Sequence, residues 1–317
     1  MVEQPAVRIG IVSWNTAGLL RRCLDALPAA VGHHRSQVVV VDNASTDDSV
    51  AAARSFPHVR VIANPTNVGY ARAMNQALDG TGAPVLIALN PDTEPPPGSL
   101  ATLVDRLLAD DGLGLIAPRL VNENQTHQHS AYRFPSPMVA AAVCFLPPRL
   151  HRGAIGRRLW LEGSGAPRRS TDVDWVVGAV HVLRASALRR KQPYDERWFM
   201  YVEDLELCWW LAQHGWRRRI ETDVLVPHVG NAAGAQAWGA DRGRRWLEAT
   251  YDWYGRDRGL GARRVLAAIN TTGAALHVVG LSIGARVGHP GRADERRNRA
   301  SALVRSLPGH LRAARWS

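Results

Sequence analysis

Residues 7–42 read VRIGIVSWNTAGLLRRCLDALPAAVGHHRSQVVVVD, and this stretch decides the fold. Val7 to Ser13 and Gln37 to Asp42 are short runs rich in β-branched residues, which indicate strands buried on both faces. Between them, Thr16 to Leu27 carries four leucines and Cys23 at helical spacing. A strand, a helix and a second strand form a βαβ unit, so the sequence predicts a mostly parallel sheet flanked by helices.

The alternation of helix and strand continues beyond this unit. We expect a helix from Ser45 to Arg54, a strand at Val59 to Ala63, a helix from Tyr70 to Leu78 and a strand at Val85 to Leu89. Later elements are a helix near Leu100 to Leu108, a loop-rich passage from Asn122 to Ser170, an ordered stretch at Asp174 to Leu183 and a helix beginning near Glu203. These elements fit one α/β catalytic core.

Composition supports a folded chain of 317 residues, because 46% of the residues are hydrophobic and 21% are charged. The three cysteines form no CxxC pair, which favours buried reduced thiols over a disulfide or metal site. Residues 1–12 lack the pattern of a secretory signal, so we expect a cytoplasmic protein. No uninterrupted apolar stretch reaches the length of a spanning helix, so we do not expect an integral membrane protein.

The formal net charge of +11 comes almost wholly from arginine and calls for an anionic partner. Nucleic acid, an anionic membrane surface and a diphosphate substrate all fit, but the excess is strongest after residue 240, which favours a docking surface. There, residues 265–287 are mostly apolar with arginines on both sides. This segment predicts either an interfacial helix at a membrane or a core helix followed by a basic tail.

Polar side chains follow each predicted strand, at the edge of a parallel sheet where ligands bind. They are Ser13-Trp14-Asn15, Asp42-Asn43, Asn64 to Asn67 and Asn90-Pro91-Asp92. A carboxylate at Asp42 can accept a hydrogen bond from a nucleotide base, while Ser45 or Thr46 can cap the next helix. The alternative is that this whole segment serves only as a helix cap.

Three further positions offer chemistry and also have structural interpretations. Asp92 can hold Mg²⁺ or Mn²⁺ if a donor phosphate completes the site, although Asn-Pro-Asp also builds a turn. His228, in VPHVG, is either a further metal ligand or a structural histidine. The pair Glu203-Asp204 follows the aromatic run WFMY and offers a general base, or else acidic charge at a helix N-terminus.

The ordered set of motifs resembles glycosyltransferase family 2, with its GT-A fold, and within it the branch of bacterial rhamnosyltransferases. The matching pieces, within residues 7–230, are VSWNTAGLLRRCLDAL, VVVVDNASTDDS, NPTNVGYARAMNQAL, LIALNPDTEP, DWVVGAVHVLRASAL, WFMYVEDLELCWWLAQHGW and VPHVG. The resemblance implies an inverting, metal-dependent transferase whose donor is a nucleotide diphosphate sugar.

The resemblance also implies roles for particular residues. Asp204 would be the general base with Glu203 beside it, and Asp92 and His228 would hold the divalent metal, Mg²⁺ or Mn²⁺. The residues expected in the nucleotide pocket are Ser13, Asn15, Asp42, Asn43, Asn67, Gly69, Arg72 and Asn90. Those expected to contact the acceptor are Trp175, Gly178 and Tyr201.

The resemblance further implies how the catalytic domain is organised along the chain. Residues 1–240 would form the catalytic domain, with the nucleotide-sugar half in 1–115 and the acceptor half in 116–240. Residues 241–317 lie beyond the resemblance, and their basic and apolar composition predicts a helical, basic region with membrane-surface attachment as one possible role. We expect dTDP-rhamnose as donor and a glycan or polyprenyl-diphosphate-linked acceptor, in cell-wall or polysaccharide synthesis at the inner face of the plasma membrane. UDP-galactofuranose and UDP- or GDP-hexoses are alternative donors.

One departure from the family concerns an arginine that commonly follows the Glu-Asp pair, where this chain has Trp210. If that arginine holds donor phosphate, either another residue such as Arg72 or Arg217 replaces it, or the choice of donor differs. Among other protein classes, a nicotinamide dehydrogenase would need a GxGxxG turn where this chain has Ser-Trp-Asn-Thr. A nucleic-acid-binding protein would need a recognition motif that is not evident here. A catalytically silent, membrane-bound scaffold on the same fold is the remaining alternative.

Overall fold

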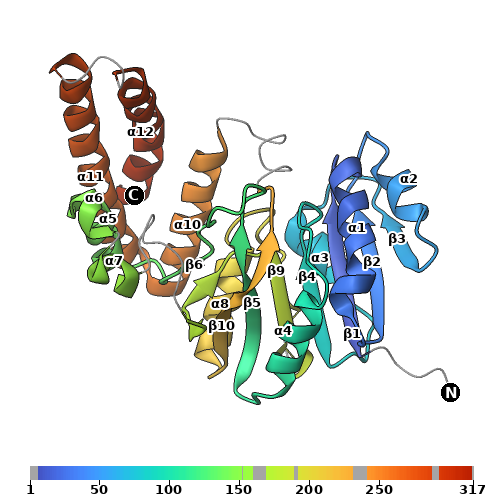
Figure 1. The fold of residues 1–317 in the computed structure, drawn as a ribbon. Coiled ribbons are helices and arrows are strands. Elements are labelled where there is room, and N and C mark those ends of the chain that lie inside the picture. Colours follow the sequence, from blue (N-terminus) through green and yellow to red (C-terminus); the bar gives the residue numbers. More distant parts are fainter. Residues whose placement is uncertain are drawn as a thin grey trace. The chain divides into compact units, whose positions relative to one another are not determined.

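Eight strands form a mixed sheet in the order β3-β2-β1-β4-β9-β5-β10-β7 (Figure 1). The computed structural model describes residues 6–151, 153–159, 169–188, 192–230, 241–287 and 293–315. The chain divides into two units, of which the first spans residues 1–132 and 165–237 and contains this sheet. The second spans residues 133–164 and 238–317.

The strands match the sequence expectation closely in the first half of the chain. They are β1 (Val7–Ser13), β2 (Ser36–Asp42), β3 (Val59–Ala63), β4 (Val85–Leu89), β5 (Leu113–Val121), β7 (Thr171–Asp172), β9 (Val180–Arg184) and β10 (Arg217–Pro227). A separate two-stranded sheet pairs β6 (Ala131–Tyr132) with β8 (Trp175–Val176).

Six of the eight strands run in the same direction. β1 is parallel to β2 and β4, β2 is parallel to β3, and β5 is parallel to β10. β9 lies between β4 and β5 and is antiparallel to both, so it preserves their common direction, and β7 is antiparallel to β10. The predicted mostly parallel sheet flanked by helices is therefore confirmed.

The helices of the first unit are α1 (Ala17–Val31), α2 (Ser49–Arg54), α3 (Tyr70–Leu78), α4 (Ser99–Leu108) and α8 (Glu203–Gln213), with a 3₁₀ turn at Ala185–Leu188. Ile9 and Ile11 of β1 pack in one buried cluster with Leu24 of α1 and Leu103 of α4. Successive strand residues point to opposite faces, so Gly10 faces α3 instead. A side chain at Gly10 would meet Ala77 and Met74 at about 3 Å, which explains why α3 can pack so closely on β1.

Helix α2 begins later than expected, and neither Ser45 nor Thr46 caps it. The carboxylate of Asp42 accepts a hydrogen bond from the backbone N–H of Ser45, which holds the segment in a turn. Oδ1 of Asp47 then accepts hydrogen bonds from the backbone N–H and the hydroxyl of Ser49, where the helix begins. The helix start is therefore set by Asp47, and the predicted capping role was wrong.

All the regular elements in the described part of the second unit are helices. It contains α5 (Pro137–Phe145), α6 (Pro148–His151), α7 (Ala154–Leu159), α10 (Arg242–Arg258), α11 (Leu260–Val287) and α12 (Ala293–Ala314). Residues 133–164 were expected in the acceptor half but group here with the C-terminal helices, because α5 packs against α11. The passage expected to be loop-rich thus contributes helices to this unit.

A buried polar chain joins four segments of the helical unit. Nδ2 of Asn270 donates to the hydroxyl of Tyr251 at 2.8 Å, and that hydroxyl lies 2.7 Å from Nδ1 of His310. The thiol of Cys144 faces Oδ1 of Asn270 at 3.8 Å. Asn270 interrupts the apolar segment in the sequence, and these contacts explain how its side chain is accommodated.

Helix α11 is longer and more apolar than the sequence led us to expect. Over Leu260–Ala285 its best window has a mean hydropathy of 1.5, so by length and composition it is apolar enough to cross a membrane. Polar residues such as Asn270 and His277 interrupt the apolar run, as the sequence showed, but they do not lower its mean hydropathy below that of a possible membrane span. Leu276, Val279 and Ile283 on this helix are each more than half exposed.

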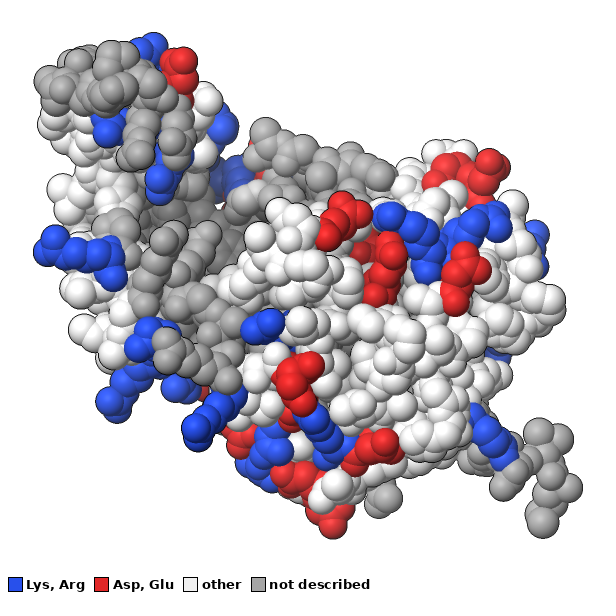
Figure 2. All heavy atoms as spheres, viewed as in Figure 1, with Lys and Arg blue, Asp and Glu red and all other residues white. Residues whose placement is uncertain are grey.

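The positive charge of the protein belongs to the helical unit. Twenty arginines and seven acidic residues fall within residues 133–164 and 238–317, which leaves nineteen basic and twenty-one acidic residues for the first unit. Figure 2 shows basic side chains predominating on the visible face of α11 and α12. The sequence placed the excess after residue 240, and the structure adds residues 133–164 to the basic region.

Candidate active site

The carboxyl ends of the parallel strands bring the candidate residues to one edge of the sheet. Asp42 ends β2, Asp92 follows β4 and His228 follows β10. The backbone N–H of His228 donates to the carbonyl of Val121 at the end of β5, and His228 also forms an isolated bridge with Thr93. β1 separates β2 from β4, so neighbouring-strand spacing puts Asp42 and Asp92 about 10 Å apart across this edge.

Asp42 is buried with one oxygen unsatisfied. Its side chain is 2% exposed, and its Oδ2 accepts a hydrogen bond from the N–H of Ser45 at 2.9 Å. Its Oδ1 has no hydrogen-bond partner among the described residues. A buried acceptor without a partner costs about 1–3 kcal/mol, so this oxygen is suited to a donor group on a ligand.

Ser13 and Asn15 shape the loop beside Asp42. The hydroxyl of Ser13 lies 2.9 Å from that of Thr16. Asn15 adopts a positive φ of 53°, its N–H donates to Oγ of Ser45, and its Oδ1 accepts from the N–H of Thr46 at 2.7 Å. These contacts tie the end of β1 to the loop after β2, and they give both residues a clear structural role.

The amide of Asn43 organises the next loop. Its Nδ2 donates to Oδ1 of Asn67 at 2.8 Å, and its Oδ1 accepts from the N–H of Val68 at 3.0 Å. Gly69 then adopts a φ of 86°, and a Cβ at this position would lie 2.6 Å from the carbonyl oxygen of Phe199. Glycine is required here because both the dihedral angle and the close approach exclude a side chain.

Arg72 and Asn90 complete the set predicted for the nucleotide pocket. Arg72 is exposed on α3, and its Nε lies 3.9 Å from a carboxylate oxygen of Glu196. The backbone N–H of Asn90 donates to the carbonyl of Ala179 at the start of β9. Asn90 therefore links the end of β4 to the antiparallel strand beside it.

Asp92 and His228 face each other in a buried position. They are 7% and 6% exposed, and Oδ1 of Asp92 lies 3.2 Å from Nε2 of His228. Nε2 nevertheless makes no hydrogen bond among the described residues. The distance is that of an ion pair, but the geometry is not that of a hydrogen bond.

Gln128 decides the tautomer of the neutral His228 ring. Nε2 of Gln128 donates to Oδ1 of Asn122 and to the carbonyl of His228, so its Oε1 faces Nδ1 of His228 at 2.7 Å. An amide oxygen only accepts, so Nδ1 carries the hydrogen and Nε2 keeps its lone pair. A lone pair and a carboxylate oxygen 3.2 Å apart fit a cation held between them, and the second hydrogen bond of the ring is typical of metal-bound histidine.

Glu203 and Asp204 are adjacent carboxyl groups at the start of α8. Burial, together with the neighbouring charge of Asp204, raises the pKa of Glu203 to about 8. Burial also raises the pKa of Asp204 to about 6, although the N–H groups of Leu205 and Gly178 act in the opposite direction. A carboxyl group with a pKa near neutrality is suited to accept a proton.

The backbone before the pair is strained. Tyr201 and Val202 have φ values of 72° and 73°, which L-residues rarely adopt, and Val202 is β-branched. Such conformations persist where the surrounding structure enforces them, and they cluster at functional sites. Here the segment is anchored by the N–H of Tyr70, which donates to the carbonyl of Phe199 at 2.7 Å.

Gly178 contacts Asp204, and Trp175 lies three positions before Gly178. The N–H of Gly178 donates to Oδ2 of Asp204 at 3.1 Å, and a Cβ at Gly178 would lie 3.3 Å from that of Asp204. Trp175 is buried and stacks on Tyr132, with ring centroids 4.6 Å apart. Of the three residues predicted for the acceptor, Gly178 thus touches the predicted base directly, and Tyr201 lies three residues before it.

Tyr70 is buried within range of the charges of three carboxylates. Burial, followed by the negative charges of Glu203, Asp204 and Asp92, raises the pKa of Tyr70 well above its usual range. The same tyrosine hydroxyl lies 3.4 Å from the carbonyl of Gly178. Asp92 and Asp204 are 112 positions apart in the chain, yet both act on this one side chain.

Sequence reasoning did not single out Gln128 or Phe199. Gln128 lies in a passage without periodicity, and no motif marks it as the partner of His228. Phe199 was part of the quoted aromatic run, but its contact with Gly69 depends on the tertiary fold. The requirement for glycine at position 69 was the one signal that pointed to a close approach of backbone.

Arg217 lies away from the carboxyl edge of the sheet, where Asp42, Asp92 and His228 are found. It is the first residue of β10, and its guanidinium pairs with Asp110 and Asp172. Because β10 is parallel to β5, its first residue lies at the amino edge, whereas His228 follows its carboxyl end. Trp210 stacks on His214 with ring centroids 3.9 Å apart. Arg72 is therefore the better placed of the two arginines considered for the donor phosphates.

A sequence model described as "Glycosyl transferase family 2" matches residues 9–161. The chain is also 30% identical, over 220 residues, to an N-acetylglucosaminyl-diphospho-decaprenol L-rhamnosyltransferase of Mycobacterium tuberculosis, which covers 65% of this chain and 70% of that relative. The chain belongs to glycosyltransferase family 2. The family match includes Asp42 and Asp92 but ends before Glu203, Asp204 and His228. It therefore says nothing about those three residues.

Other comparisons place this family 2 glycosyltransferase among related sequences and folds. It is 30% identical over 224 residues to a pre-mycofactocin glycosyltransferase of Mycobacterium tuberculosis, covering 68% of this chain and 40% of that relative. The mannosyltransferase PcManGT from Pyrobaculum calidifontis, solved with GDP-Man and Mn²⁺, has a TM-score of 0.61 at 19% identity and covers 99% of this chain and 88% of its own. These findings confirm the GT-A fold and a rhamnosyltransferase-like branch of the family.

Proposed function

We propose that this glycosyltransferase takes a sugar from a nucleotide diphosphate donor and transfers it, with inversion, to an acceptor hydroxyl, with Asp204 as the general base. The observation that carries the proposal is a pair of neighbouring backbone contacts: the N–H of Gly178 donates to Asp204, and the carbonyl of the next residue, Ala179, accepts from the N–H of Asn90, two positions before Asp92. It supports a single site in which Asp92 lies on the side of the donor and Asp204, with a pKa of about 6, acts as the base.

The donor lies along the carboxyl edge of the sheet, across the end of β1. The unsatisfied Oδ1 of Asp42 accepts a hydrogen bond from the nucleotide base, and the diphosphate reaches the side of Asp92 about 10 Å away. Ser13, Asn15, Asn43, Asn67 and Gly69 hold the intervening loops in shape. Arg72 and Asn90 border the same pocket on α3 and β4.

Asp92 and His228 are the proposed ligands of a divalent cation, Mg²⁺ or Mn²⁺. The free lone pair on Nε2 of His228 and the facing carboxylate oxygen fit this role, and Gln128 orients the imidazole. When bound, the cation supplies positive charge to the leaving diphosphate. Asn90 contributes no charge, so the donor phosphates complete the set of ligands.

Asp204 acts on the acceptor. One of its carboxylate oxygens takes the proton from the acceptor hydroxyl, while the hydroxyl oxygen forms the new bond to the anomeric carbon. The bond from that carbon to the diphosphate breaks on the opposite face, and the diphosphate leaves with the bonding electrons. The N–H of Gly178 holds Asp204 in place at 3.1 Å, and Glu203 keeps its own proton because its pKa is about 8.

We propose dTDP-rhamnose as the donor and a glycan or polyprenyl-diphosphate-linked sugar as the acceptor, in cell-wall or polysaccharide synthesis. The support is the similarity to the Mycobacterium tuberculosis L-rhamnosyltransferase that acts on N-acetylglucosaminyl-diphospho-decaprenol. UDP-galactofuranose and UDP- or GDP-hexoses are the alternative donors. Trp175, Gly178 and Tyr201 are the proposed acceptor contacts, because Gly178 touches Asp204, Tyr201 lies three residues before it and Trp175 lies three residues before Gly178.

The helical unit supports attachment to the inner face of the plasma membrane. It carries all the excess positive charge of the chain, and Leu276, Val279 and Ile283 expose apolar side chains at spacings that share one helix face. An anionic bilayer attracts such a surface through charge and through burial of the apolar side chains. A lipid-linked acceptor would be presented in the same place.

A transfer assay tests the proposal. Purified protein with dTDP-rhamnose, Mn²⁺ and a polyprenyl-diphosphate-linked sugar should release dTDP only when donor and acceptor are both present, and a thermal-shift screen should show that one nucleotide sugar with Mn²⁺ raises the melting temperature most. If a different nucleotide sugar raised the melting temperature most, that sugar would replace dTDP-rhamnose as the proposed donor. Absence of release with every nucleotide sugar, from a protein that binds them, would favour the silent scaffold.

A further inference from the structure

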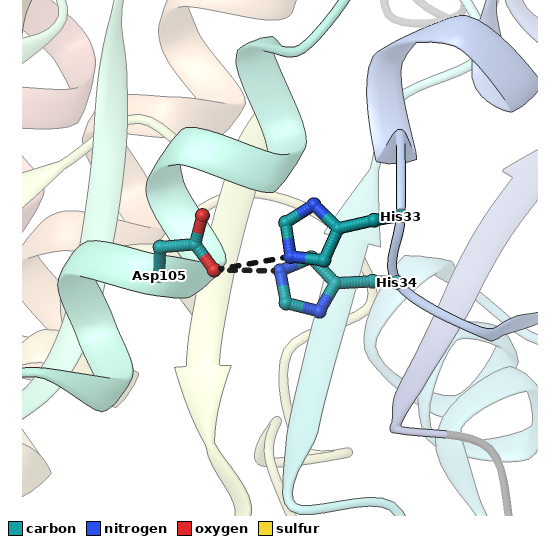
Figure 3. A group of neighbouring side chains, drawn as sticks. All are labelled: His33, His34 and Asp105. Carbon is teal, nitrogen blue, oxygen red and sulfur yellow. Dashed lines mark hydrogen bonds and ion pairs between the residues drawn. The ribbon is translucent and has the colours of Figure 1, made fainter.

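His33, His34 and Asp105 bring three metal-ligating side chains together outside the proposed active site (Figure 3). Gly32 ends α1 with a positive φ of 59°, and the two histidines follow it in the turn that leads to β2. Asp105 lies on α4. The carboxylate therefore comes from one element and both imidazoles from another.

The three ligand atoms converge on a small space. Nε2 of His34 lies 2.9 Å and Nε2 of His33 lies 3.7 Å from the same oxygen, Oδ1 of Asp105. The two imidazole centroids are 4.1 Å apart, and all three ligand atoms lie within 4.8 Å of one another. A tetrahedral zinc ion, with bonds of about 2.0–2.2 Å, separates neighbouring ligand atoms by about 3.3 Å. The observed distances lie on either side of that value.

The scaffold around the three side chains is rigid. Leu24 and Val31 of α1 and Leu103 and Leu107 of α4 belong to the same buried cluster. The backbone N–H of Gly98, just before α4, donates to the carbonyl of Ala29 within α1. Small rotations of exposed side chains, rather than movement of the helices, would complete the site, since the side chains of His33 and Asp105 are 70% and 54% exposed.

We propose that His33, His34 and Asp105 form a binding site for a divalent transition-metal ion such as Zn²⁺ or Ni²⁺. Two imidazoles and one carboxylate favour these ions over Mg²⁺, which prefers oxygen ligands. Three protein ligands leave the remaining positions to water, which the exposure of the cluster permits. The bound ion ties the turn after α1 to α4 and stabilises the fold.

This site is separate from the proposed active site. The histidines precede β2 at its amino end, whereas Asp42 ends that strand at the edge that carries Asp92 and His228. A seven-residue strand spans about 20 Å, so both sites can be occupied at once. Binding of a transition metal at His33, His34 and Asp105 therefore changes stability without depending on sugar transfer.

Calorimetric titration with Zn²⁺ tests the proposal in untagged protein that carries Asp92→Asn and His228→Gln, so that the proposed active-site ligands are removed. We expect one equivalent of Zn²⁺ to bind and to raise the melting temperature. In this same background, the further substitutions His33→Ala and His34→Ala should weaken Zn²⁺ binding at least tenfold. Asp105→Asn alone should also weaken Zn²⁺ binding, and it leaves both histidines in the turn unchanged. His58→Ala is the matched control, because His58 is exposed elsewhere in the same unit.

Two results would overturn the site. One is the absence of saturable Zn²⁺ binding in the protein that retains the three side chains. The other is unchanged affinity after either His33→Ala with His34→Ala or Asp105→Asn, which would leave a simple hydrogen-bonded cluster. Neither result bears on the glycosyltransferase assignment, since the titration contains no nucleotide sugar and the active-site ligands are already removed.

Discussion

Replacing the proposed base by Asp204→Asn should abolish sugar transfer while it stabilises the protein. The asparagine has nearly the same shape, and its Oδ1 can accept from the N–H of Gly178 or from that of Leu205, which the two carboxylate oxygens of Asp204 accept separately. It cannot take a proton from the acceptor hydroxyl. A positioned general base contributes about 10²–10⁴ in rate, so we expect kcat to fall by about that factor.

The stability change follows from the pKa of Asp204. Burial raises it from 3.8 to about 6, so the ionised form is less favourable in the folded protein than in the unfolded chain. This contribution is favourable at low pH and is lost as the pH rises through about 6. A shift of about two units corresponds to at most about 3 kcal/mol, and partial exposure of Asp204 reduces it. The variant should therefore unfold at a higher temperature than wild type at pH 8, and at a similar temperature near pH 4.

The pH profile of the wild-type enzyme provides a second readout. Transfer needs ionised Asp204, so kcat/KM should rise about tenfold per unit from pH 4 to about 6 and then level off. In Asp204→Asn, the pKa of Glu203 should fall, because the charge of Asp204 helps to raise it in the wild type. Nuclear magnetic resonance titration of labelled Glu203 would measure this change.

Nucleoside diphosphate release and thermal unfolding at pH 4 and pH 8 are the assays for this variant. Glu206→Gln is the matched control, because Glu206 is an acidic residue two positions further along α8 and therefore points to another side of the helix. Retention of more than a tenth of wild-type transfer would refute Asp204 as the base. A melting temperature at pH 8 equal to or below that of wild type would refute the argument from burial.

Four further predictions concern other parts of the chain. Asp42→Asn should weaken binding of the donor nucleotide by about 1–3 kcal/mol in a calorimetric titration, and unchanged affinity would remove Asp42 from the nucleotide site. His228→Gln should weaken Mn²⁺ binding at least tenfold, about 1.4 kcal/mol, in the presence of nucleoside diphosphate, and equal affinity would show that the histidine is structural. Gly69→Ala should lower the free energy of unfolding by more than about 1 kcal/mol, measured with urea, because the new side chain needs an unfavourable φ and meets Phe199. Val279→Asp should reduce sedimentation with anionic vesicles without affecting dTDP release. The control Leu108→Asp, which changes an exposed apolar position in the first unit, should sediment like the wild type. Equal sedimentation of the wild type and both variants would count against membrane attachment through α11.

Local pattern was enough to predict the first half of the fold. The strands at Val7–Ser13, Val59–Ala63 and Val85–Leu89 and the helix at Tyr70–Leu78 agree with the expectation residue by residue. Strands buried on both faces need continuous apolar runs, and such runs are visible in a sequence. The start of α2 was wrong because hydrogen bonds to Asp42 and Asp47 outweigh the local preference of Ser45 and Thr46.

The candidate site was predicted as a list of residues rather than as a geometry. The motifs singled out Asp92 and His228, but the part of Gln128 in orienting the imidazole depends on a contact across 100 positions. Likewise, the motifs singled out Asp204, but its raised pKa depends on burial. Burial and hydrogen-bond partners are properties of the packed chain, so no spacing rule reports them.

The sequence by itself determined the class of fold, the family resemblance and the identity of the chemical groups. Periodicity and strand-end residues are local, and they need only neighbouring positions to be read. The tertiary structure alone decided that β1 separates Asp42 from Asp92, that an antiparallel β9 enters the sheet and that residues 133–164 join the C-terminal helices. It also decided that the segments of Asp92 and Asp204 are joined, through the backbone contacts of Asn90 with Ala179 and of Gly178 with Asp204. These features depend on pairings between distant segments, whose free energy comes from burying surfaces that only the folded chain brings together.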